Sequence, residues 1–104
     1  MTKIEAIELC LELWTWLKEN PGKKKSDWPR FKEIALMRAN CPACQYAYQI
    51  RPTTEEIACK YCPVWIGASF CVWDGYRGWT IGQMPQFADL VIKLCKERLH
   101  ELNA

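Results

Sequence analysis

Apolar residues recur at helical spacing near both ends of the chain. Residues 2–20 carry one stripe at intervals of three and four, which predicts an amphipathic helix. The stripe consists of Ile4, Ile7, Cys10, Leu11, Leu13, Trp14 and Leu17, while Glu5, Glu8 and Glu12 fall on the opposite face. Thr2 and Glu5 have the spacing of a capping box at its start. Asn20-Pro21-Gly22 is expected to end this helix, because proline disfavours a helical residue before it.

Residues 84–102 predict a second long helix. Its stripe consists of Phe87, Leu90, Val91, Leu94 and Leu102, with Cys95 and Leu99 at the margin. Basic side chains in the later turns suit the negative end of the helix dipole. Two helices that each carry one apolar stripe must bury it, so we expect them to pack against each other.

The pattern between these helices is shorter and less regular. Ser26 or Asp27 can cap a second, short helix that ends near Asn40. Tyr46, Tyr48 and Ile50 alternate as in a short strand, with a short helix as the alternative. Asp74-Gly75 is a hairpin-type turn signal. The sequence therefore predicts a small, mainly α protein with an α+β fold as the alternative. It has two terminal helices and one short helix around an irregular or hairpin-containing middle.

Composition predicts one globular domain. The chain has 104 residues, half of them apolar and a quarter charged, and its net charge is only +2. We expect three parts in this domain: helical residues 1–40, a cysteine-containing middle at 41–82, and the helix at 83–104. No apolar run approaches the ~18–20 residues of a membrane span. Acidic residues interrupt the N-terminal apolar pattern, which argues against a signal peptide and for an intracellular protein.

Cysteine spacing is the strongest chemical signal. Of seven cysteines, four form the pairs Cys41-Pro-Ala-Cys44 and Cys59-Lys-Tyr-Cys62, with fourteen residues between the pairs. In a reducing compartment this pattern is typical of a tetrathiolate metal site. We therefore predict one structural Zn²⁺ held by Cys41, Cys44, Cys59 and Cys62. Such a closed site keeps no open position for water or substrate.

Several alternatives for the cysteines stay open. Iron uses the same thiolate ligands and is the less favoured metal. A redox dithiol of the thioredoxin type would need a Cys-x-x-Cys at a helix start in a βαβ context, which the pattern lacks. Cys71 either replaces Cys59 as the fourth ligand or lies in the core, which is the favoured interpretation. Cys10 and Cys95, on or beside the helical stripes, are expected to be buried and inert.

These residues resemble a group of short proteins encoded by tailed bacteriophages. The similarity lies in Trp14-Thr-Trp16-Leu17 and Asp27-Trp28-Pro29, in the two cysteine pairs, and in Cys71 with Tyr76-Arg-Gly-Trp79. The group has no assigned activity, so the resemblance implies no catalytic residues. It implies a phage accessory protein, located in the cytoplasm of a bacterial host, that binds and modulates or inhibits a host protein, defence proteins included.

Catalytic motifs are missing from the sequence. It has no phosphate-cradling glycine loop, no Gly-x-Ser-x-Gly and no His-Glu-x-x-His. The only histidine, His100, lies near the C-terminus, where a solvated role is expected. We therefore predict a binding module with no enzymatic activity.

Two groups of residues could bind a partner. The basic segment at 23–38 could contact nucleic-acid phosphates while an aromatic ring stacks on a base. Its candidate phosphate contacts are Lys23, Lys24, Lys25, Arg30, Lys32 and Arg38, and the stacking ring would be Trp28 or Tyr46. The second group could anchor a protein partner, because Trp, Tyr and Arg dominate interface hot spots. It consists of Trp73, Tyr76, Arg77 and Trp79. A host protein is the predicted partner, and zinc-dependent DNA or RNA binding is the alternative.

Overall fold

The protein is mainly α, as its sequence predicts. The structure, a computed structural model, describes residues 1–37, 40–50, 62–64 and 85–103. These residues contain three α-helices and two short 3-10 helices, and no strand. In chain order the elements are α1 (Lys3–Glu19), η1 (Lys25–Asp27), η2 (Phe31–Glu33), α2 (Pro42–Ile50) and α6 (Pro85–Asn103). None of the helices described is long and apolar enough to cross a membrane.

The start of α1 is the predicted capping box. The backbone N–H of Glu5 donates to the Thr2 hydroxyl over 3.1 Å, and the N–H of Thr2 donates to the Glu5 carboxylate over 2.9 Å. The hydrogen bond from Thr2 lowers the pKa of Glu5. At the other end, the Asn20 side chain donates to the Trp16 carbonyl over 2.8 Å. Gly22 then takes a positive φ of 84°, which glycine adopts without strain.

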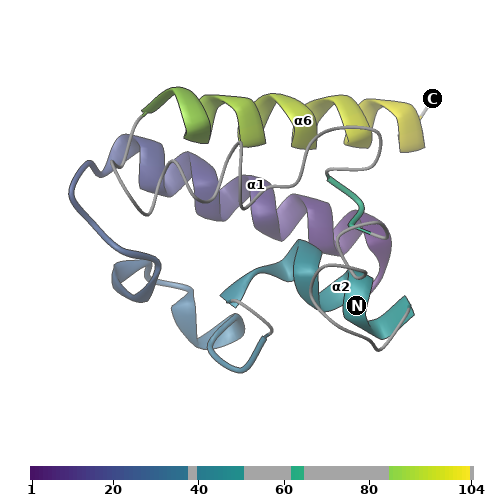
Figure 1. Cartoon of the computed structure of the whole chain (residues 1–104), viewed down its shortest axis with the longest axis horizontal. Coiled ribbons are helices and arrows are strands. Elements are labelled where there is room, and N and C mark those ends of the chain that lie inside the picture. Colours follow the sequence, from purple (N-terminus) through teal and green to yellow (C-terminus); the bar gives the residue numbers. More distant parts are fainter. Residues whose placement is uncertain (38–39, 51–61, 65–84, 104) are drawn as a thin grey trace.

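Helices α1 and α6 run antiparallel and side by side (Figure 1). The Lys18 ammonium near the end of α1 pairs with the Asp89 carboxylate near the start of α6, as this arrangement requires. The buried side chains of α1 are Ala6, Ile7, Cys10, Leu13, Trp14 and Leu17, and those described for α6 are Ala88, Val91, Leu94 and Cys95. The predicted packing of the terminal helices is confirmed.

The side chains buried between α1 and α6, here called the apolar seam, are fewer than the predicted stripes contain. Ile4 and Leu11 are only partly buried, and Leu102 is 40 % exposed although the stripe included it. Cys95, placed at the margin by the pattern, is fully buried. A seam between two helices is narrower than the full set of apolar positions, because only the residues facing the neighbour are covered. The side chain of Phe87 lies outside the described ones.

The predicted short helix between Asp27 and Asn40 is wrong. The 3-10 turn η1 ends at Asp27, and the described part of the expected span forms the 3-10 turn η2 at Phe31–Glu33 in place of an α-helix. Pro29 keeps Trp28 out of the helical conformation, because proline disfavours that conformation in the residue before it. Trp28 accordingly has an extended backbone with ψ of 131°. Its ring is 5 % exposed, and Ile34 is fully buried, so these two side chains anchor the turns in the core.

The Tyr46–Ile50 alternation belongs to a helix and not to a strand. The sequence allowed either a short strand or a short helix here, and the structure has the short helix α2. Its buried face consists of Pro42, Ala43 and Ala47, small residues that allow close packing against α1. Ile50 is exposed at the end of the helix. The predicted turn at Asp74-Gly75 lies outside the described residues.

Candidate metal centre

Cys41 and Cys44 lie at the beginning of α2. Cys41 occupies the position before the first helical residue, and its carbonyl accepts the first helical hydrogen bond from Gln45 N–H over 3.0 Å. Pro42 follows at the first helical position, which its fixed φ suits. The backbone N–H of Cys44 donates to the Cys41 sulfur, which therefore caps the helix as a serine or aspartate would. The local sequence alone brings this pair together.

The surroundings of Cys41 favour a thiolate. Hydrogen bonds from the Cys10 thiol and then from the Cys44 thiol lower the pKa of Cys41 well below its ordinary value. The Lys25 ammonium and the backbone N–H of Cys44 act in the same direction, whereas burial opposes them. A thiolate is the form of cysteine that binds a metal ion, so this end of α2 suits a soft cation.

Cys10 and Cys95 extend this pair into the core. Cys10 of α1 is 2 % exposed and makes side-chain hydrogen bonds with both Cys41 and Cys95. The two hydrogen bonds, the one with Cys41 first, and burial raise the pKa of Cys10 well above its ordinary value. We call Cys10, Cys41, Cys44 and Cys95 the thiol cluster. The prediction that Cys10 and Cys95 are buried is confirmed. The sequence does not predict the contacts of Cys10 with Cys41 and with Cys95, because no local spacing encodes a contact between different helices.

Lys25 faces this cluster from η1. Its ammonium donates to the Asn40 carbonyl over 3.3 Å and lies 5.7 Å from the centre of the Trp14 ring. Asn40 has a left-handed backbone with φ of 48°, a conformation that asparagine tolerates. The Asn40 side chain also donates to the carbonyls of Ile34 and Ala35. Lys25 and Asn40 thus fix the backbone immediately before Cys41.

The other predicted metal ligands are only partly described. Cys62 is buried in the same core as α1 and α6, and the neighbouring Val64 carbonyl accepts a 3.3 Å hydrogen bond from Arg98 of α6. Cys59 and the alternative ligand Cys71 lie outside the described residues. Within the described ranges, no group of three or more His, Cys, Asp or Glu side chains could hold a metal ion. The donors at Cys41 and Cys44 fit zinc chemically, and the four-sulfur site stays a prediction.

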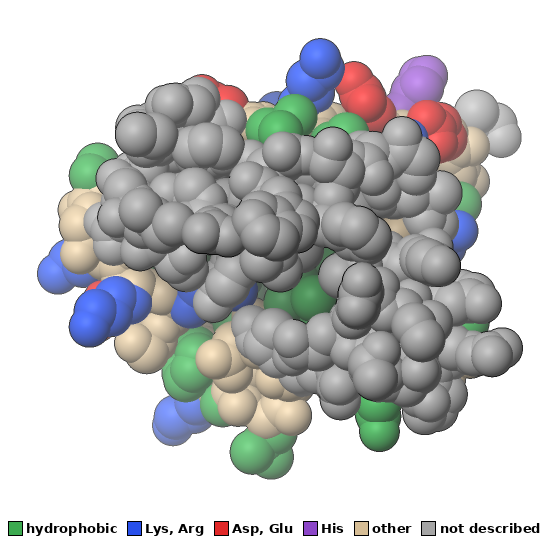
Figure 2. Space-filling view, in the orientation of Figure 1, with side chains coloured by type: hydrophobic (Ala, Val, Ile, Leu, Met, Phe, Trp, Pro, Cys, Tyr) green, Lys and Arg blue, Asp and Glu red, His purple; other side chains and the backbone are tan. Residues whose placement is uncertain are grey.

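The basic segment is less open to a partner than its sequence suggests. Lys23 and Lys24 are exposed, but Lys25 is half-buried. The prediction that Trp28 stacks on a base is also wrong, since its ring lies in the core. Lys and Arg side chains are visible along the left and lower-left margin of Figure 2, over the segment that joins α1 to α2. The predicted anchors Trp73, Tyr76, Arg77 and Trp79 lie outside the described residues.

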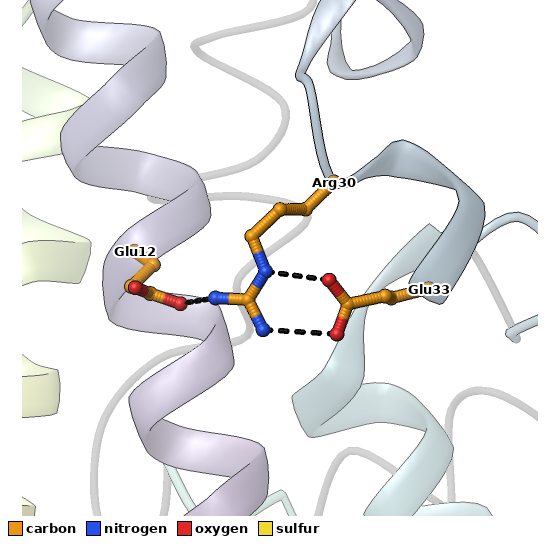
Figure 3. Close-up of polar contacts among 3 residues, drawn as sticks. All are labelled: Glu12, Arg30 and Glu33. Atoms are coloured by element: carbon orange, nitrogen blue, oxygen red, sulfur yellow. Dashed lines mark hydrogen bonds and ion pairs between the residues drawn. The ribbon is translucent and has the colours of Figure 1, made fainter.

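Arg30 is held between two carboxylates (Figure 3). Its guanidinium pairs with Glu12 of α1 on one side and makes two hydrogen bonds, of 2.5 and 2.9 Å, with Glu33 on the other. The guanidinium carbon also lies 5.6 Å from the centre of the Trp28 ring. Because these contacts already neutralise Arg30, it is poorly placed to bind phosphate as well.

An acidic hollow lies beside this ion pair. Its lining consists of Met1, Glu5, Glu8, Leu9, Leu11, Glu12, Arg30 and Glu33. Glu5, Glu8 and Glu12 of α1 are exposed on one face, as the sequence predicts. This face repels nucleic acid, because phosphates and carboxylates carry the same charge.

Comparisons with known proteins give no family assignment. A scan against family models and searches of curated proteins and of solved structures found no match. The resemblance to phage proteins therefore stays a prediction based on the motifs themselves.

Proposed function

We propose that this protein is a non-enzymatic binding module, stabilised by one structural zinc ion, that a bacteriophage uses to modulate or inhibit a host protein. One observation carries the metal part of the proposal. Cys41 and Cys44 present two adjacent sulfurs at the start of α2, and the Cys41 thiolate is favoured by its neighbours. The zinc ligands would be Cys41, Cys44, Cys59 and Cys62, and the ion would link α2 to the chain at 59–62.

A structural role for this ion agrees with the chemistry around it. Four thiolates fill the coordination shell of zinc and leave no place for a substrate or an activated water. The single histidine, His100, is exposed near the end of α6 and is far in sequence from the cysteine pairs. These features support a binding protein and give no support to a hydrolytic zinc enzyme.

The metal part is tested on protein purified under reducing conditions. We expect a colourless protein with one zinc per chain, and exhaustive chelation should lower its melting temperature. Cys44→Ser should lose the zinc, whereas Cys95→Ser, which removes a thiol outside the predicted ligand set, should keep it. Protein without bound metal, or a coloured protein containing iron, would contradict the proposal.

A host protein is favoured over nucleic acid as the partner. Within the basic segment, Lys25 donates to the Asn40 carbonyl, Arg30 is paired with carboxylates, and Trp28 is buried. Among the described basic residues of the segment, Lys23, Lys24 and Lys32 are exposed and outside these contacts, which is few for a binding site that relies on many phosphate contacts. The anchors Trp73 and Trp79 are retained in the proposal on sequence grounds.

Affinity capture from bacterial lysate at two salt concentrations separates the two partners. A protein partner should be retained at high salt and lost in Trp79→Ala. The matched control Lys23→Ala/Lys24→Ala should retain it. A nucleic-acid partner would show the opposite pattern: an electrophoretic shift that disappears at high salt and in the double lysine variant. That outcome would establish the alternative, zinc-dependent DNA or RNA binding.

A further inference from the structure

We draw no further inference here: the strongest candidate, the acidic hollow between α1 and η2 that Glu5, Glu8, Glu12 and Glu33 line around Arg30, is a cluster of exposed carboxylates whose guanidinium is already paired, and no second observation in the described residues points to a ligand for it.

Discussion

The α1–α6 pair and the segment from Asn20 to Ile50 are stabilised in different ways. Along the pair, a continuous seam of apolar side chains is buried between two long helices. The segment has only short elements, and two isolated side chains, Trp28 and Ile34, fix its turns to the core. Local polar contacts supply the rest of the stabilisation of this segment. For example, the Lys24 N–H donates to the Asp27 carboxylate. The α1–α6 pair is thus stabilised by long periodic runs of apolar residues, whereas the turn segment depends on single buried side chains.

The candidate metal centre lies where these two regions meet. Cys41 is part of the segment, but Cys10 reaches it from α1, and Lys25 reaches it from η1. A bound ion would therefore add a strong link between the turn segment and the apolar seam. This arrangement suits a small chain, because metal binding can supply stability that a modest core does not.

Leu13→Ala tests the α1–α6 seam and should have the largest effect on stability. Leu13 is fully buried in the middle of α1. Its truncation leaves a cavity between two long helices that cannot easily collapse, and we expect it to lower the free energy of unfolding by about 3–5 kcal/mol. Urea denaturation followed by far-UV circular dichroism measures the change.

Leu36→Ala is the control for this substitution. The side chain of Leu36 is fully exposed, so its loss should change the unfolding free energy by about 0.5 kcal/mol or less. Similar effects at both leucines would mean that the seam does not dominate stability, and the contrast between the two regions would fail.

Ile34→Ala tests the anchoring of the turn segment and should have a smaller effect. Ile34 is as buried as Leu13, but it belongs to a short turn that can move toward the cavity. We expect a loss of about 2–3 kcal/mol. Hydrogen exchange should show the loss first in amides of η2 and α2, and later in the middle of α1. Equal loss of protection in all helices would show that the two regions unfold as one unit.

Sequence patterns predict the long helices well and the middle of the chain poorly. The capping box at Thr2 and Glu5 and the stripe through Ile7 and Leu17 depend on neighbours in one helix, and both are confirmed. The short helix expected after Asp27 does not begin at Trp28, because Pro29 disfavours helical geometry at that residue. Apolar positions within three or four residues of each other cannot show which of them will face a neighbouring helix.

The candidate site, too, could be predicted from the sequence only where its residues are close together in the chain. Cys-x-x-Cys spacing is local, so the pairing of Cys41 with Cys44 could be predicted. The contact between Cys10 and Cys41 joins residues about thirty positions apart and follows only from the packing of α1 against α2. Likewise, the lysine run gives no sign that Lys25 turns inward over Trp14.

Glu33→Gln tests the link from the turn segment to α1 and should have the smallest effect. Arg30 lowers the pKa of Glu33 through their hydrogen bonds, and Glu12 binds the same guanidinium from α1. Because the folded pKa lies below the unfolded one, this stabilisation is present above the ordinary glutamate pKa of about 4.3 and is lost as pH falls through the lowered value. Wild type should therefore melt slightly above the variant near neutral pH, and the two should converge in acid. High salt should also reduce the difference, since the pair is exposed. A melting difference that survives both acid and salt would show that Glu33 contributes through packing, and the polar link between the two regions would then be unsupported.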